Sequence, residues 1–254
     1  MYINNTIVDE RNTPVPFEAP IDKFGKVGGL SASSNFPQDI CQVSEVYAGF
    51  PATAEQMEVL SSDAADTVAG TGARTVTVGN LRDIDGNAMP DVTVDMDGTT
   101  PVSLGTQEYY RSSRARVVTV GSGGANAGAI TVRHKTTTAN VFSVIPINAN
   151  TTLLMAYTVP LGKTMYIRKG LVSVGRAGGA LGSADITIRT RSPVADSPFV
   201  ALRAVMVTSS SAYTYPNAGY FVVNERYDFK VSVEDVSDGD TTVSAEYDAY
   251  LVDN

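Results

Sequence analysis

The residue types that most often carry out chemistry in proteins are scarce in this sequence. His134 is the only histidine and Cys41 the only cysteine among 254 residues. A serine–histidine–aspartate triad needs a histidine as its base, and most zinc hydrolases need two or three as ligands. A lone cysteine excludes an intrachain disulfide and a zinc site built from cysteines. His134 lies in a basic run with no carboxylate nearby in sequence, which favours an exposed strand residue over a catalytic base.

Two aspartate-rich segments have oxygen ligands at the alternate positions that a calcium loop needs. The first runs from Asp83 to Asp91, and the second runs from Asp235 to Asp240. The first departs from the EF-hand pattern, because Gly86 comes too early and no glutamate closes the loop. A hairpin turn between two alternating runs explains this segment more simply, and calcium binding is the less favoured alternative.

Two further patterns match known binding sites only weakly. The stretch 121–128 has the glycine content of a phosphate loop, but it lacks the lysine and the following helix, so a flexible loop is favoured. Arg111, Arg114 and Arg116 follow Tyr109 and Tyr110, an interleaving found in some single-strand binders. A solvated sheet face opposite acidic residues explains the arginines more simply. We find no catalytic constellation, and we expect neither an enzyme nor a bound cofactor or metal.

The elements that would position these groups are strands. Runs such as 74–78, 129–133, 226–234 and 243–251 alternate apolar and polar residues, as half-buried strands do. Gly-rich and Asp-Gly turns separate the runs at a spacing of about 8 to 12 residues. No segment has a convincing helical face. The sequence therefore predicts an all-β protein built from antiparallel sheets.

The chain divides into an arm and two β-domains. Residues 1–45 contain four prolines and no sustained period, which predicts an extended N-terminal arm. A polar interruption at 148–152 leaves about 100 residues on each side of it, the size of a small β-sandwich. We expect a β-sandwich domain over 46–150 and a jelly-roll-like β-sandwich domain over 151–254.

The predicted arm carries more apolar residues than a solvated tail needs. Such terminal segments are commonly disordered. The alternative, which accounts for the apolar residues, is an arm that becomes ordered when it binds a partner. The residues expected to bind such a partner are Ile3, Ile7, Phe17, Ile21, Phe24, Leu30 and Phe36.

The charge balance argues against nucleic acid as a partner. The net charge is -8, whereas nucleic-acid binding normally needs a basic field. No apolar run approaches the roughly 18 to 20 residues of a membrane span, and the N-terminus lacks a signal-peptide pattern. The charge also alternates along the chain, because 151–224 has seven basic and two acidic residues while 225–254 has two basic and nine acidic. Either adjacent strands neutralise each other, or oppositely charged faces orient the packing of subunits.

Four stretches resemble segments of tailed-bacteriophage virion proteins. Residues 63–78, the turn 83–87 and residues 92–102 together resemble a module of such proteins. Residues 157–167 are similar to the strand–turn–strand opening of the β-rich domain that follows this module. The resemblance covers roughly residues 60–200. It implies a structural component of the virion, such as a capsid decoration (cement) protein, a head fibre or a tail part, and it transfers no catalytic residue.

The leading hypothesis is a decoration protein on the outer capsid surface of a virion. Its arm would bind the major capsid protein, and its two β-domains would form a protrusion. Three copies would assemble as a homo-trimer around a threefold axis. The alternative is a tail or fibre component that binds a receptor or carbohydrate, for which Tyr213, Tyr215 and Tyr220 form the best candidate loop. We expect no membrane or nucleic-acid partner.

Overall fold

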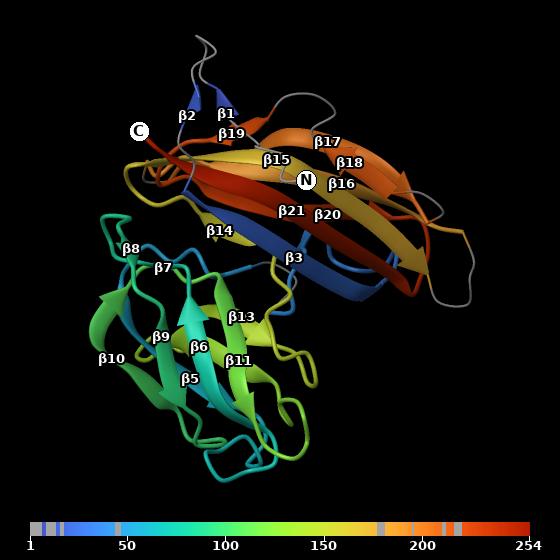
Figure 1. The fold of residues 1–254 in the computed structure, drawn as a ribbon. Coiled ribbons are helices and arrows are strands. Elements are labelled where there is room, and N and C mark those ends of the chain that lie inside the picture. Colours follow the sequence, from blue (N-terminus) through green and yellow to red (C-terminus); the bar gives the residue numbers. More distant parts are fainter. Residues whose placement is uncertain are drawn as a thin grey trace, which may run out of the picture.

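The computed structural model consists of strands throughout the part of the chain that it describes. The backbone is described for residues 7–8, 14–15, 18–43, 47–176, 181–194, 196–209, 212–215 and 220–254. These ranges contain antiparallel sheets and no helix, which confirms the all-β prediction (Figure 1). Within the same ranges, therefore, no helix is long and apolar enough to cross a membrane.

The first domain is formed by two sheets and a short hairpin. One sheet has the order β10 (Val102–Tyr109), β5 (Glu55–Ser61), β12 (Ile130–His134) and β13 (Val141–Ile145). The other has the order β11 (Arg114–Val120), β6 (Ala73–Gly79) and β9 (Val92–Asp95), and β7 (Leu81–Arg82) pairs with β8 (Ala88–Met89). Fully buried Met57, Val76 and Phe142 belong to one hydrophobic core between the two sheets. Alternate side chains of β5, β9, β11 and β12 supply or pack against this core, as expected for a sandwich.

The second domain is a sandwich of two larger sheets. One has the order β14 (Ala156–Thr158), β20 (Asp228–Val236), β16 (Ser183–Arg191) and β17 (Val200–Thr208), with β4 (Gln38–Asp39) also paired to β20. The other has the order β18 (Ala212–Tyr215), β15 (Lys163–Arg176), β21 (Thr241–Asp253) and β3 (Glu18–Leu30), with β19 (Phe221–Val223) also paired to β15. Its jelly-roll connectivity stays a prediction.

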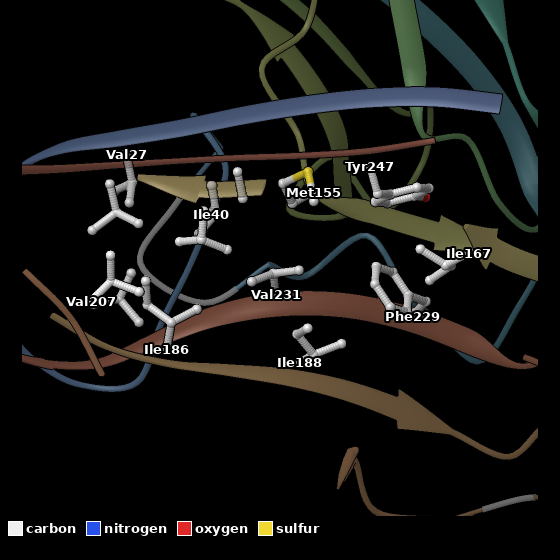
Figure 2. Packing of buried hydrophobic residues seen from close by; sticks show 14 of the residues in the cluster. Val27, Ile40, Met155, Ile167, Ile186, Ile188, Val207, Phe229, Val231 and Tyr247 are labelled. Atoms are coloured by element: carbon white, nitrogen blue, oxygen red, sulfur yellow. The ribbon is translucent and has the colours of Figure 1, made fainter. Parts of the chain in front are cut away.

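The core of the second domain joins both of its sheets. Phe229 of β20 packs edge to face on Tyr247 of β21, with the ring centroids 5.2 Å apart. Figure 2 shows these rings together with Val27 and Ile40, which come from the N-terminal part of the chain. The core of the second domain is therefore completed by residues that precede the first domain in sequence.

The structure places most of the predicted arm inside the second domain. β3 pairs along nearly its whole length with β21, and β4 pairs with β20. The positions of β3 that face inward include Lys23, Gly25 and Val27, while Phe24 and Lys26 are exposed. Because a lysine and a glycine occupy two of these inward positions, the strand lacks the apolar alternation that marks the other strands. β3 is thus an integral edge strand of the sandwich, and β4 joins the opposite sheet.

Candidate functional site

A small separate hairpin lies at the start of the chain. β1 (Ile7–Val8) pairs antiparallel with β2 (Pro14–Val15), and the two form a sheet that pairs with no other described strand. Figure 1 shows this hairpin on the side of the second domain away from the first domain. Of the residues predicted to bind a partner, Ile7 lies in this hairpin, and Ile3 and Phe17 lie outside the described residues.

The other predicted partner-binding residues belong to the second domain. Ile21 lies in β3 opposite Ala249 of β21. The side chain of Leu30 is buried in the core, and Phe36 packs against the same core. Phe24 is 45% exposed. A partner would reach Leu30 only by unpacking the sandwich, so of these four residues Phe24 is the one whose described side chain is accessible.

A buried carboxylate connects the two domains. Asp228, at the start of β20, is 4% exposed. It accepts hydrogen bonds from Nε and Nη2 of Arg111 at 3.3 Å each, from Thr158 Oγ1 at 2.6 Å, and from Nε of Arg191 at 3.1 Å. Nη2 of Arg191 also donates to it. Arg111 follows β10 of the first domain, whereas the other three residues lie in the second. We call Asp228, Arg111, Arg191 and Thr158 the junction cluster.

The segment between β4 and β5 forms a second connection. Asp39 accepts hydrogen bonds from Lys230 Nζ at 2.8 Å, Ser232 Oγ at 2.7 Å and the backbone N–H of Tyr47 at 2.8 Å. The hydroxyl of Tyr47 donates to the carbonyl of Phe142 in the first domain at 2.8 Å. Burial raises the pKa of Tyr47 well above its usual value, so this hydroxyl stays protonated and able to donate. The two domains are thus joined by satisfied, buried polar groups.

A buried lysine lies beside the same junction. Nζ of Lys23 donates to the carbonyl of Ser113 and lies 5.9 Å from the centroid of the Tyr157 ring. Burial lowers the pKa of Lys23 to about 7, and the positive charges of Arg114 and Arg82 add to the effect. This amine therefore changes its charge near neutral pH.

A cleft of about 310 Å³ opens where the two domains meet. The first domain lines it with residues 50–52, with Ile84 and Gly86 from the β7–β8 turn, and with Tyr110 and Arg111. The second domain contributes Thr158, the loop after β16, Arg226 and Asp228. The junction cluster forms part of its lining. We call this feature the interdomain cleft.

The interdomain cleft is locally positive in an acidic chain. Its lining holds the guanidinium groups of Arg111, Arg191 and Arg226 and the carboxylates of Asp196 and Asp228. Three positive and two negative charges give a local balance of +1, against -8 for the whole chain. The field of this balance favours a negatively charged ligand over a neutral or positively charged one.

Aromatic rings hold one of these arginines in place. The guanidinium carbon of Arg191 lies 5.3 Å from the ring centroid of Phe50 and 4.8 Å from that of Phe199. With Asp228 holding Nε and Nη2, the ring contacts fix the plane of the guanidinium group. Nη1 of Arg191 has no acceptor among the described residues, and its side chain is 24% exposed. Arg191 therefore has donor capacity left for a ligand.

The structure corrects the expectation that His134 is exposed. Its side chain is fully buried, with Nε2 at 3.2 Å from the carbonyl of Tyr109 and Nδ1 at 3.2 Å from Nδ2 of Asn140. Burial lowers the pKa of His134. Glu55, far away in sequence, lies 3.7 Å from Nδ1. His134 is thus a hydrogen-bonded core residue, and no solvent-accessible base is provided at this position.

The Asp83 segment forms the predicted hairpin turn. The two carboxylate oxygens of Asp83 accept hydrogen bonds from the backbone N–H and from Nδ2 of Asn87, both at 2.8 Å, and β7 pairs with β8 on either side. Across the ranges whose side chains are described, no group of three or more histidine, cysteine, aspartate or glutamate side chains is placed to hold a metal ion.

The glycine-rich stretch 121–128 is held by a buried aspartate that sequence reasoning did not single out. Asp66 is fully buried. It accepts hydrogen bonds from the backbone N–H of Ala127 at 2.8 Å and of Gly128 at 2.9 Å, and from Ser61 Oγ at 2.6 Å. In the sequence, the only indication of a structural role for Asp66 is its position in a run of small and turn-forming residues. This loop is part of the scaffold of the first domain.

The predicted tyrosine loop exposes one described ring. Tyr213 packs against the core of the second domain, the side chain of Tyr215 lies outside the described residues, and residues 216–219 also lie outside them. Tyr220 is 41% exposed and contacts Tyr166 edge to face at 6.1 Å between centroids.

Apolar side chains are exposed on a strand at the edge of the second domain. β17 is the last strand of its sheet. Val200 is 59% exposed, Leu202 41% and Met206 69%, and a register shift at Leu202 places Val200 and Met206 on different faces of the strand. Edge strands of soluble proteins normally carry charge or proline that blocks pairing with other chains, so this edge has the features of a contact surface.

Comparison with protein-family models and with curated proteins finds no match. Among solved structures, a chain of the naturally occurring empty particles of cowpea mosaic virus is 8% identical, with 83% of this chain and 84% of that chain covered and a TM-score of 0.20. A chain of the T=1 particles derived from infectious bursal virus is 8% identical, with 98% and 73% covered and a TM-score of 0.25. At such TM-scores the likeness carries no functional conclusion.

Proposed function

We propose that this chain is a non-enzymatic structural protein of a virion. Its specific role is that of a capsid decoration (cement) protein, which binds the major capsid protein on the outer surface and stabilises the shell. The resemblance of roughly residues 60–200 to tailed-bacteriophage virion proteins supports this setting. The observation that carries the proposal is the separate hairpin β1–β2 at the start of the chain.

The hairpin has the properties of an element that docks on a partner. An isolated two-stranded hairpin is marginally stable in water and needs a third strand or a packing surface. Ile7, Val8 and Val15 make it apolar, and β1 and β2 pair with no other strand in the described part of the chain. The major capsid protein would supply the missing surface.

The other described strands would connect a docked hairpin firmly to both domains. β3 follows the hairpin directly and is held along nearly its whole length by β21. Asp228 and its partners then fix the second domain to the first. A rigid body docked through several contacts gains affinity because each contact raises the effective concentration for the next.

A homo-trimer is the proposed oligomeric state, and the exposed apolar edge strand β17 is a candidate contact between copies. Introducing a charge at Met206, which is 69% exposed, would then weaken assembly without disturbing the core. Sedimentation equilibrium of the wild type and of Met206→Lys tests this. Val118→Lys, at a 51% exposed position in the first domain, is the matched control. A monomeric wild type would refute the trimer.

Removal of residues 1–17 tests the docking role of the hairpin, because this deletion leaves β3 complete. We expect co-sedimentation of the truncated chain with empty shells of its own virus to fall about tenfold or more, since the capsid contacts of the hairpin are lost. The thermal melting of the truncated chain should stay close to that of the full chain. Unchanged shell binding would refute the proposal.

A tail or fibre component that binds a receptor or carbohydrate is the second candidate. The interdomain cleft and the exposed ring of Tyr220 favour it, since clefts at domain boundaries commonly bind small ligands. Cryo-electron microscopy of the intact particle separates the two candidates. Density for this chain on the capsid faces is expected for a decoration protein, and density confined to the tail would overturn that assignment in favour of this second candidate.

A further inference from the structure

We propose that the interdomain cleft binds a carboxylated monosaccharide, such as a terminal uronic acid or sialic acid of a glycan. The site uses no residue of the β1–β2 hairpin. Ligand binding in the cleft is therefore independent of capsid attachment through the hairpin. Either a decoration protein or a tail component could have this site.

The size and position of the cleft suit a small ligand. Its volume of about 310 Å³ is at the lower end of the range for small-molecule sites, which is roughly 300 to 1,000 Å³. Both domains line it, and the hydrogen bonds of Asp228 to Arg111 and Thr158 hold the two sides together. A cleft held in this way is formed before the ligand arrives, which lowers the entropic cost of binding.

Two arginines offer hydrogen-bond donors toward a carboxylate. Asp228 accepts from Nε and Nη2 of Arg191 but not from Nη1. Arg226 is exposed, and its guanidinium group has no acceptor within the described part of the chain. Its backbone has a positive φ of 63° and is fixed by a 2.8 Å hydrogen bond from its N–H to the carbonyl of Val159. Arginine is the side chain best suited to bind a planar carboxylate through paired hydrogen bonds.

The charge of the cleft matches a monoanion better than a phosphate. The lining carries a balance of +1, which a single carboxylate neutralises. A phosphate monoester carries about -1.5 to -2 at pH 7. It would also meet the carboxylates of Asp196 and Asp228 in the same lining. A nucleic-acid backbone, with its run of charges, fits such a small and weakly positive cleft still less well.

The remaining lining suits the ring of a sugar. Phe50, Tyr110 and Pro193 contribute apolar atoms to the lining, which a sugar ring could contact, and Ser192 and Ser197 add hydroxyl groups. Ser and Thr hydroxyls both donate and accept, as sugar hydroxyls require. Sites of this kind combine apolar walls with a few polar groups that fix orientation.

The test is an NMR chemical-shift titration of the full chain with four probes. These are methyl β-D-glucuronide, the methyl glycoside of N-acetylneuraminic acid, methyl β-D-glucoside and inorganic phosphate. We expect at least one carboxylated sugar to bind, with shifts at the residues lining the cleft, and both the glucoside and phosphate to bind about tenfold or more weakly. Equal binding of the glucoside, tighter binding of phosphate, or no binding by either acidic sugar would overturn the proposal.

Three variants locate the site. Arg226→Gln removes an exposed charge that pairs with no described residue, and we expect it to weaken binding of the acidic sugar about tenfold. Val194→Glu, at a 70% exposed position in the lining, adds a carboxylate and should weaken binding as much. Arg116→Gln is the matched control, because Arg116 is exposed on β11 outside the cleft lining. Loss of affinity in the control alone, or unchanged affinity in both cleft variants, would place any binding elsewhere.

Discussion

The buried carboxylate of Asp228 binds groups from both domains. It is 4% exposed and holds two arginines, one from each domain. A buried charge is tolerated only when its partners neutralise and hydrogen-bond it, and removal of one partner leaves the others uncompensated. Arg111 and Arg191 therefore depend on this single carboxylate.

Asp228→Asn is expected to destabilise the protein by about 3 to 5 kcal/mol, because the two arginines lose their counterion in a buried setting. Urea denaturation followed by circular dichroism measures the change. The control is Asp196→Asn, an exposed carboxylate in the lining of the same cleft, which should change stability by less than about 0.5 kcal/mol. Equal effects of the two substitutions would contradict the role given to Asp228.

Lys23 gives the stability of the protein a defined pH dependence. Its pKa in the folded protein is about 7, below the usual value of 10.5, because burial disfavours the charged amine. Between these two values the unfolded chain binds more protons than the folded one, so the contribution of Lys23 to stability increases as the pH rises. Below about pH 7 the folded state carries the full cost of a buried charge.

The wild type should therefore gain about 1 kcal/mol of stability per pH unit from Lys23 between pH 7 and pH 9. Lys23→Met should reduce this gain, because the variant has no amine to titrate. Lys26→Met, at an exposed position on the same strand, should keep the slope of the wild type. Urea denaturation at several pH values measures each slope, and identical slopes in wild type and Lys23→Met would count against the assignment.

At the scale of elements, β3 decides the architecture of the second domain. It supplies one edge of a sheet whose other members lie more than a hundred residues further along the chain. Gly25 lets β3 pass close to the segment that leads into β14. A Cβ atom added there would lie 2.4 Å from Cγ of Met155 and 2.9 Å from its backbone nitrogen. The close approach is therefore limited by backbone as well as by a side chain.

Gly25→Ala is expected to destabilise the protein by about 1 to 3 kcal/mol, because the strand must move away from Met155. Gly175→Ala is the matched control, since Gly175 is also in a strand and an added Cβ there meets nothing within 4 Å. Thermal denaturation of the two variants measures the difference. A melting temperature for Gly25→Ala equal to that of Gly175→Ala would show that β3 is less closely packed than described.

At the scale of the whole molecule, the two domains are expected to depend on the N-terminal segment together. Residues 18–43 complete the second sandwich, and Asp39 and Tyr47 then lead the chain into the first domain. Deletion of residues 1–43 would remove β3 and β4, and with them Val27, Leu30 and Ile40, and would expose the remaining core of the second domain. The shortened chain would still contain all residues of the two β-domains that the sequence predicts, 46–150 and 151–254.

We expect the chain without residues 1–43 to lose cooperative thermal unfolding and near-ultraviolet circular dichroism, because an open sheet edge and an incomplete core are left behind. The chain without residues 1–17 should keep both signals, since β3 remains. A cooperative melt of the shorter chain near the wild-type temperature would refute the structural role of the N-terminal segment.

Local patterns in the sequence predict the all-β class, several strands and the hairpin turn after β7. The run 226–234 overlaps β20 (Asp228–Val236), and the run 243–251 lies within β21 (Thr241–Asp253). These features follow from local patterns, because the alternation of apolar residues and the chemistry of turns act over a few neighbouring positions. The scarcity of histidine and cysteine likewise needed only a count.

Three features appear only in the folded chain. β3 pairs with β21, His134 is buried, and Asp228 contacts Arg111, which is 117 positions away in sequence. Each of these depends on contacts between segments far apart in the chain. Lys23 at an inward position reads as polar in the sequence, and it is accommodated only because the first domain covers it and offers the carbonyl of Ser113. The interdomain cleft exists for the same reason, since its walls come from two domains whose packing no local pattern encodes.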